Sequence, residues 1–189
     1  MCSVQNKQIN DAVDVLKNGG IVAYPTESVY GLGCDPFNEN AIKRLIELKD
    51  RNPAKGLILI ASSFEQVRPF LEVLPPELES KIRETWPGAI TWLWPTKAST
   101  SPLLRGKQHT LAVRITAHPL AKKICSLFGG AIVSTSANIS GEEAARNYET
   151  VSNKIINQID YIVKGETGSY SSPTEIRDVI SGKIIRPAK

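Results

Sequence analysis

The stretch "HPLAKKICSLFGGAIVSTSANISG", residues 118–141, contains a helix, a strand and a polar loop in direct succession. "HPLAKKICSLFG" has a proline near its first turn and a glycine after its last turn, which is typical of a helix. The run "AIVS" then predicts a short buried strand, and "STSANISG" offers small uncharged hydrogen-bonding groups directly after it. Strands that are apolar on both faces indicate a sheet covered by helices, and hence an α/β fold.

The same alternation extends to both ends of the chain. The spacing of apolar residues predicts helices at 9–16, 38–49, 64–71, 76–86, 118–129 and 151–159. Strands are expected at 21–24, 56–61, 89–95, 110–116, 131–134, 161–164, 173–179 and 183–187, with loops at 25–36 and 96–109. Short strands concentrate in the last third, which favours a mixed sheet. No composition break divides the chain, so we expect one domain over residues 1–189.

Composition is that of a globular protein, because 41% of the 189 residues are hydrophobic and 22% are charged. The net charge is +4, and the isoelectric point of about 9.0 permits a nucleic acid or polyphosphate partner without requiring one. No apolar run approaches the roughly 18 residues of a membrane span. The first residues lack the layout of a signal peptide. These features predict a cytoplasmic protein.

Cysteine and histidine usage argues against a zinc site or a disulfide framework. The three cysteines, Cys2, Cys34 and Cys125, are scattered, and the two histidines are His109 and His118. Cys34 has no basic neighbour in sequence that would make it a nucleophile. The three tryptophans are expected to pack in the core. Neither a P-loop nor a dinucleotide-binding glycine motif occurs, so a bound nucleotide would be held in another way.

Polar segments follow four of the predicted strands, and ligands of open α/β sheets bind beyond the carboxyl ends of strands. If these ends converge, one cleft contains Thr26, Arg114, Ser134, Ser136, Asn138 and Arg186. Separately, a helix end carries Lys49, Arg51 and Lys55. Arginines, lysines and hydroxyls of this kind position and neutralise anions. Plain turns, helix caps and a solvated helix end are the alternative interpretations of these segments.

Six segments, taken in order, resemble the YrdC/TsaC family of threonylcarbamoyl-AMP synthases. They are "AYPTESVYGLGCD", "LKDRNPAKGLILIA", "RETWPGAITWLWP", "LAVRITAHPL", "VSTSANISG" and "SPTEIRD". Each is weak alone, but their order and spacing over about residues 5–186 make a strong signal. The length is similar to that of the short, single-domain TsaC type.

The resemblance implies a twisted open mixed sheet with flanking helices and a basic concave face. It implies a nucleotidyltransferase that makes L-threonylcarbamoyl-AMP from L-threonine, bicarbonate and ATP and releases pyrophosphate. A downstream threonylcarbamoyl transferase complex then modifies an adenosine next to the anticodon of tRNA. ATP and bicarbonate would be substrates, and Mg²⁺ the expected cofactor.

Site residues follow from the matched motifs. The resemblance implies that the threonine substrate is bound by Thr26, Arg114, Ser134 and Thr174. It implies that ATP is bound by Lys49, Arg51, Lys55, Thr110, Ser136, Asn138 and Arg186, with Lys49 and Arg51 as the catalytic pair. Glu27 and Asp35 have the right chemistry for Mg²⁺, but no motif fixes a metal site.

Two other classes of function compete with the enzyme. One is an RNA-binding module that uses the basic concave face for double-stranded or ribosomal RNA. The other is a regulatory protein that binds threonine or a nucleotide without turnover. The lack of clustered Lys/Arg blocks and of an aromatic RNA-binding signature disfavours the first. Release of pyrophosphate that depends on threonine separates the enzyme from both.

Overall fold

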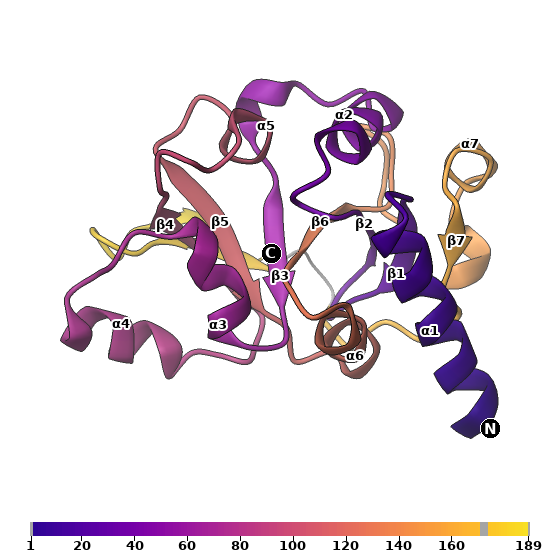
Figure 1. Ribbon diagram of the computed structural model, residues 1–189, viewed down its shortest axis with the longest axis horizontal. Coiled ribbons are helices and arrows are strands. Elements are labelled where there is room, and N and C mark those ends of the chain that lie inside the picture. The colour runs from indigo at the N-terminus through magenta and orange to yellow at the C-terminus, as the bar shows by residue number, and fades with distance from the viewer. Residues whose placement is uncertain (1, 171–173, 189) are drawn as a thin grey trace.

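A computed structural model describes residues 2–170 and 174–188. Ser172 and Pro173, which open the motif "SPTEIRD", lie outside the described residues. The core of the structure is a nine-stranded sheet in the order β7-β1-β2-β6-β3-β5-β4-β8-β9 (Figure 1). Pairs β1–β7, β3–β5 and β4–β8 are parallel, and the other pairs are antiparallel. The prediction of a mixed α/β sheet is therefore confirmed.

The strands are β1 (Val22–Pro25), β2 (Tyr30–Gly33), β3 (Ile58–Ala61), β4 (Ile90–Pro95), β5 (Thr110–Ile115), β6 (Ile132–Ser136), β7 (Tyr161–Ile162), β8 (Glu175–Asp178) and β9 (Ile184–Arg186). The α-helices are α1 (Cys2–Lys17), α2 (Glu39–Leu48), α3 (Phe64–Val67), α4 (Pro76–Arg83), α5 (Pro102–Arg105), α6 (Pro119–Phe128) and α7 (Asn153–Ile156). Short 3-10 turns are η1 (Pro53–Lys55), η2 (Arg68–Phe70) and η3 (Tyr148–Thr150).

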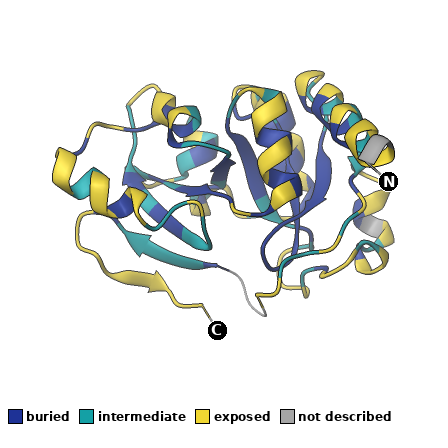
Figure 2. Cartoon of the chain, turned by 90° about the horizontal axis from the view of Figure 1, so that it is seen from below, coloured by how far each residue is buried: buried dark blue, intermediate teal, exposed yellow. Residues whose placement is uncertain are grey.

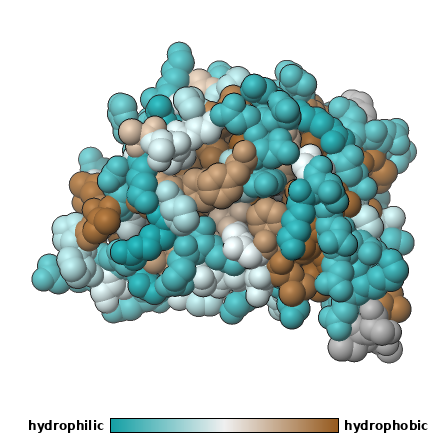
Figure 3. Space-filling model, viewed as in Figure 1, coloured by the Kyte–Doolittle hydropathy of each residue, from teal (hydrophilic) through white to brown (hydrophobic). Residues whose placement is uncertain are grey.

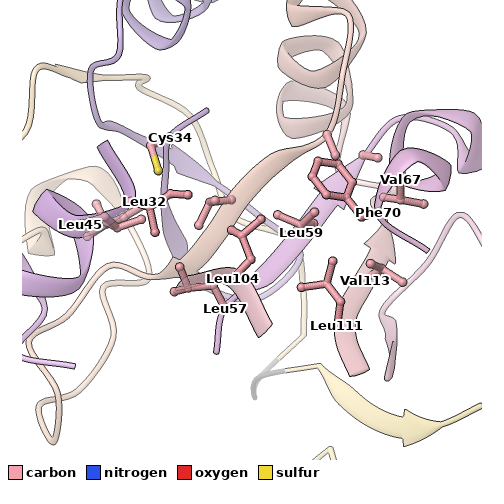
Figure 4. Packing of buried hydrophobic residues seen from close by; sticks show 14 of the residues in the cluster. Leu32, Cys34, Leu45, Leu57, Leu59, Val67, Phe70, Leu104, Leu111 and Val113 are labelled. Atoms are coloured by element: carbon pink, nitrogen blue, oxygen red, sulfur yellow. The ribbon is translucent and has the colours of Figure 1, made fainter. Parts of the chain in front are cut away.

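Helices cover both faces of the sheet, as the apolar strands predict. Apolar residues of α2, α3, α4 and α5 join the larger buried cluster on one face. Figure 4 shows part of this cluster, in which Leu59, Val113 and Leu104 pack together. Helices α1 and α6 pack on the other face around Tyr24 and Ile60 (Figure 1). The tryptophans pack in or against the larger cluster, as expected.

The expected loop at 25–36 is wrong over Tyr30–Gly33, which forms β2 between β1 and β6. Neither Gly31 nor Gly33 has a positive φ. The reason for glycine is space: a Cβ on Gly33 would lie 2.6 Å from the Val133 carbonyl oxygen and 2.8 Å from the ring of Tyr24. The second expected loop, 96–109, contains the short helix α5.

In the view of Figure 3 hydrophilic residues dominate, and hydrophobic residues form separate patches. The C-terminal strand β9 is exposed along its whole length (Figure 2). Within residues 2–170 and 174–188, no helix has the length and apolar character needed to cross a membrane.

Candidate functional site

A cavity of about 150 Å³ opens on the sheet face that carries α1 and α6. It is lined by Thr26, Ser28, Val29, Gly31, Arg51, Ile58, Arg114, Ser134, Thr135, Ser136, Thr174 and Arg186. Strand register explains the shared face, because Gly31 lies opposite Ser136 and Ile58 opposite Ser134. Arg114 pairs with Ile60, two residues from Ile58, and so points to the same side. This face of the sheet therefore has two regions. One is apolar and covered by α1 and α6, and the other forms the polar cavity.

The expectation that strand ends converge is wrong in its geometry. Of the four strands that precede the polar segments, β1 and β6 run in one direction and β5 and β9 in the opposite direction, so their carboxyl ends lie at two edges. The polar side chains meet because they occupy alternate positions on one face of neighbouring strands. Thr26, Arg114, Ser134, Ser136 and Arg186 nevertheless line one cavity, as predicted.

The turn from β1 to β2 supplies one wall of the cavity. The Thr26 hydroxyl donates a 2.7 Å hydrogen bond to the Val29 carbonyl, and the Thr26 amide donates to the same oxygen. Gly31 lies behind this turn, where a Cβ would be 3.2 Å from Thr26 Cγ2 and 3.3 Å from Ser134 Oγ. A glycine there lets the two hydroxyl-bearing side chains approach each other.

Arg114 is buried and surrounded by polar partners. Its Nη2 lies 3.2 Å from Oε2 of Glu27, and its Nη1 donates a 2.9 Å hydrogen bond to Thr174 Oγ1. The Thr174 hydroxyl also hydrogen-bonds Thr91 on β4, at 3.1 Å. Burial acts to raise the pKa of the Glu27 carboxyl, but Arg114 and the Thr116 hydroxyl bring that pKa below its ordinary value. The site therefore contains an ionised, buried carboxylate–guanidinium pair.

Two more guanidinium groups complete the positive lining. Arg51 donates from Nε and Nη2 to the Gly56 carbonyl, at 3.0 and 2.8 Å. Arg186, on the last strand, donates a 2.6 Å hydrogen bond to the Thr174 carbonyl. Partial burial and the like charges of Arg114 and Arg51 lower the pKa of Arg186. Three arginines against one carboxylate make this an anion site.

Lys49 lies behind the cavity wall, with 2% of its surface exposed. Its ammonium donates to the carbonyl oxygens of Ser136 and Asn138, each at 2.5 Å, and to the Asn138 side-chain oxygen at 3.1 Å. Ser136 Oγ donates to that same side-chain oxygen at 2.5 Å. Lys49 therefore fixes the loop that follows β6, and Asp50, at φ 46°, separates it from Arg51.

The remaining predicted residues lie outside the cavity lining. Asn138 contacts the site through Ser136 and Lys49, Lys55 is exposed at the end of η1, and Thr110 is half-buried at the start of β5. Sequence reasoning missed the lining residue Ile58 and the buried Thr91 behind the cavity. Their roles depend on the pairing of β3 with β6 and of β4 with β8, which no local motif reports.

Neither carboxylate considered for Mg²⁺ lines the cavity. Glu27 is paired with Arg114, and Oδ1 of Asp35 accepts a 2.8 Å hydrogen bond from the Phe37 amide. The residues that line the cavity include no carboxylate. Across residues 2–170 and 174–188, no group of three His, Cys, Asp or Glu side chains comes together. The described residues therefore do not fit a metal held by the protein.

Cys34 and Cys125 are free thiols, both buried. Cys34 points into the larger apolar cluster beside Leu32 and Leu45 (Figure 4). Burial raises the pKa of the Cys34 thiol to about 12, with a smaller effect of Asp35. A thiol of this kind is protonated and inert at neutral pH, so it takes no part in nucleophilic chemistry.

Curated relatives match the chain over almost its whole length. The threonylcarbamoyl-AMP synthase of Aliivibrio fischeri is 48% identical over 182 residues, which cover 95% of this chain and 98% of that protein. The threonylcarbamoyl-AMP synthase of Coxiella burnetii (strain RSA 493 / Nine Mile phase I) is 46% identical over 180 residues, covering 95% and 97%.

Solved structures share the fold. P. abyssi Sua5 complexed with L-threonine superposes with a TM-score of 0.88 at 32% identity, over 95% of this chain and 53% of that chain. E. coli YciO superposes with a TM-score of 0.80 at 24% identity, over 97% and 92%. The profile of the Sua5/YciO/YrdC family, described as "Telomere recombination", matches residues 14–188. The chain therefore belongs to the Sua5/YciO/YrdC family.

Proposed function

We propose that this chain synthesises L-threonylcarbamoyl-AMP from L-threonine, bicarbonate and ATP and releases pyrophosphate. The observation that carries the proposal is the cavity itself, which combines the guanidinium groups of Arg51, Arg114 and Arg186 with small hydroxyls. All three substrates are anionic or carry a carboxylate. Curated relatives at 46–48% identity bear the name of this activity.

The amino acid is assigned to the inner end of the cavity. Arg114 offers its positive charge and its remaining N–H donors for the substrate carboxylate, and Thr26, Ser134 and Thr174 offer hydroxyls for its side chain and amine. That P. abyssi Sua5 was solved in complex with L-threonine supports threonine as the amino acid. We propose that a single domain carries out the whole reaction.

ATP is assigned to the side of Arg51, Ser136 and Arg186. Arg51 and Arg186 neutralise phosphate charge that grows as pyrophosphate leaves, which is electrostatic catalysis. The loop that Lys49 holds presents Ser136 and Asn138 toward the nucleotide. Lys55 and Thr110 remain proposed nucleotide contacts, reached by the parts of ATP that extend beyond the cavity.

The chemistry begins at the threonine nitrogen. Three arginines and no lining carboxylate disfavour an ammonium ion in the cavity, and so favour the neutral amine that carries a lone pair. This nitrogen bonds to the carbon of bicarbonate, and water leaves. An oxygen of the resulting N-carboxylate then attacks the α-phosphorus of ATP, and the bond to pyrophosphate breaks. Holding the reactants in line supplies much of the rate.

Mg²⁺ is proposed to arrive with ATP, held by phosphate oxygens and water, because the cavity offers it no carboxylate. A threonylcarbamoyl transferase complex is expected to take the product to tRNA in the cytoplasm. Direct contact with RNA through the basic face remains a separate proposal.

The test is a pyrophosphate-release assay with ATP and bicarbonate, and with threonine, serine or valine in turn. We expect release that requires threonine and bicarbonate together. Release at the same rate without an amino acid would show a simple nucleotide hydrolase. No release, combined with an RNA affinity that falls steeply with salt, would favour the RNA-binding module.

A further inference from the structure

We infer that Glu27 is a positioning residue, which holds the guanidinium of Arg114 in the orientation that receives the carboxylate of the amino-acid substrate. The inference rests on the proposed function, because it takes an amino acid as the ligand of Arg114. Glu27 itself does not line the cavity, whereas Arg114 does. Its effect on substrate must therefore pass through Arg114.

The pair is enclosed by protein. The exposed fractions of the side chains are 6% for Arg114 and 5% for Glu27, and Nη2 and Oε2 are 3.2 Å apart. Nη1 is fixed by the Thr174 hydroxyl. Within the described part of the chain, Nε of Arg114 and Oε2 of Glu27 are each buried without a hydrogen-bond partner, so Glu27 holds Nη2 by charge. Arg114 thus has one hydrogen-bonded nitrogen, one ion-paired nitrogen and one unused buried donor.

The carboxylate of Glu27 is anchored from its other oxygen. Oε1 accepts hydrogen bonds from the Thr116 hydroxyl at 2.6 Å and from the Ala117 amide at 3.0 Å, in the segment between β5 and α6. Behind it, a Cβ on Gly168 would lie only 2.5 Å from the Glu27 carbonyl oxygen. The close packing fixes the main chain of Glu27, and the two hydrogen bonds fix its carboxylate. The position of this carboxylate then determines the orientation of the Arg114 guanidinium.

Charge explains why a carboxylate is needed. Arg114 and Arg51 each lie close enough to Arg186 for their charges, together with burial, to lower the pKa of Arg186. Without Glu27, the repulsion between Arg114 and Arg186 would push these two guanidinium groups apart. A buried ion pair contributes little net stability compared with apolar residues of the same size. Its presence beside the cavity therefore points to substrate orientation.

The experiment compares Glu27→Gln with a matched control, Thr116→Val. Glu27→Gln removes the negative charge and keeps the size of the side chain. Thr116→Val removes a hydrogen bond to Oε1 but leaves the ion pair with Arg114. Calorimetric titration measures the affinities for L-threonine, for L-threoninamide, which lacks the carboxylate, and for ATP. Thermal unfolding of each variant measures the loss of stability.

We expect Glu27→Gln to weaken L-threonine binding about 10-fold or more, the scale of one hydrogen bond to a charged group. ATP affinity should change less than about 2-fold, because Arg51 and Arg186 keep their own contacts. L-Threoninamide should bind wild type and variant alike, because it offers Arg114 no carboxylate. Thr116→Val should lower the melting temperature and weaken threonine binding clearly less than Glu27→Gln does, because the charge of Glu27 and its hydrogen bond from the Ala117 amide remain.

Three outcomes would overturn the inference. Equal losses for threonine and ATP, or a threonine loss in Thr116→Val as large as in Glu27→Gln, would show a merely structural role. Unchanged threonine affinity in a folded Glu27→Gln would show that Arg114 needs no partner. If Glu27→Gln does not fold, the same titrations are made with Glu27→Asp, which keeps the charge but has a shorter side chain. The same outcomes then overturn the inference. Failure of wild type to bind threonine would overturn the proposed function as well.

Discussion

The hydroxyl of Thr174 accepts a 2.9 Å hydrogen bond from Nη1 of Arg114, across 60 residues of sequence. The same nitrogen also donates to the Thr91 hydroxyl at 3.5 Å, and Glu27 pairs with Nη2. The main-chain carbonyl of the same threonine accepts from Arg186. One residue therefore contacts both an arginine assigned to the amino acid and an arginine assigned to ATP, through different atoms.

That separation predicts a selective effect of Thr174→Val. The substitution removes the hydroxyl but keeps the carbonyl, so threonine affinity should fall about 10–100-fold, the scale of a lost hydrogen bond to a charged group. ATP affinity should be nearly unchanged. Thr174→Ser keeps the hydroxyl and serves as the control. Calorimetric titration checks both ligands, and equal weakening of the two would contradict the assignment.

Arg186→Ala should have the opposite selectivity. It removes a guanidinium from the nucleotide side of the cavity, and we expect ATP binding to weaken by roughly 1.5–3 kcal/mol. Since Arg186 is exposed on the edge strand β9, its loss should barely change the melting temperature. A folded variant with wild-type ATP affinity, measured by titration, would remove Arg186 from the site.

Amino-acid choice should follow the order threonine, serine, valine in turnover per concentration. A missing methyl group costs only about 1–3 kcal/mol, whereas a hydroxyl pocket left without its partner discriminates on the order of 10⁴-fold. Thr26→Val should narrow the gap between threonine and valine and leave ATP affinity nearly intact. The pyrophosphate assay measures this order. If wild type used valine as well as serine, the hydroxyls of Thr26, Ser134 and Thr174 would not read the substrate.

Lys49 gives a prediction for pH. Burial, with a smaller effect of the Arg51 charge, lowers the pKa of its ammonium to about 8. The folded pKa lies below the unfolded one, so the unfolded chain binds more protons between these values, and stability should rise with pH across that window. Lys49→Met should lose this slope. Urea unfolding above about pH 8 measures it, and an equal slope in both proteins would refute the assignment.

The same deprotonation should affect the nucleotide. A neutral amine binds the carbonyls of Ser136 and Asn138 more weakly than an ammonium does. ATP affinity of the wild type should therefore fall as pH rises through about 8, and Lys49→Met should show weaker but flatter binding. A wild-type affinity that is constant over this range would show that the loop does not depend on the ammonium.

The sequence predicted the parts of this molecule that local patterns determine. Apolar spacing located α2 and α6 closely, because each presents one apolar stripe to the sheet, but it found only the second half of α1, which begins at Cys2 and not at residue 9. The strand β2 escaped detection, because "YGLG" has the composition of a loop while its glycines are required by close packing against Tyr24. The sequence of one strand does not report which side chain of a neighbouring strand packs against it.

In the site, too, local motifs were predicted and contacts between distant segments were not. Thr26, Arg114, Ser134 and Arg186 were predicted to share a cleft, and they do. The contact of Glu27 with Arg114 and Thr116 could not be predicted, because it depends on how the β1–β2 turn meets the end of β5. Spacing alone also did not show that the Lys49 ammonium turns toward main-chain carbonyls while Arg51 lines the cavity.

The placement of the cavity on a face of the sheet limits how substrates enter and products leave. Its floor consists of the hydrogen-bonded strands β2, β6, β3 and β5, and the larger apolar cluster backs that floor. Neighbouring hydrogen-bonded strands leave no passage for a solute between them. Threonine, bicarbonate and ATP must enter from the same side by which pyrophosphate and the adenylate depart. If ATP is seated over the amino acid at the mouth of the cavity, it blocks the way in and out, and the amino acid then binds before ATP.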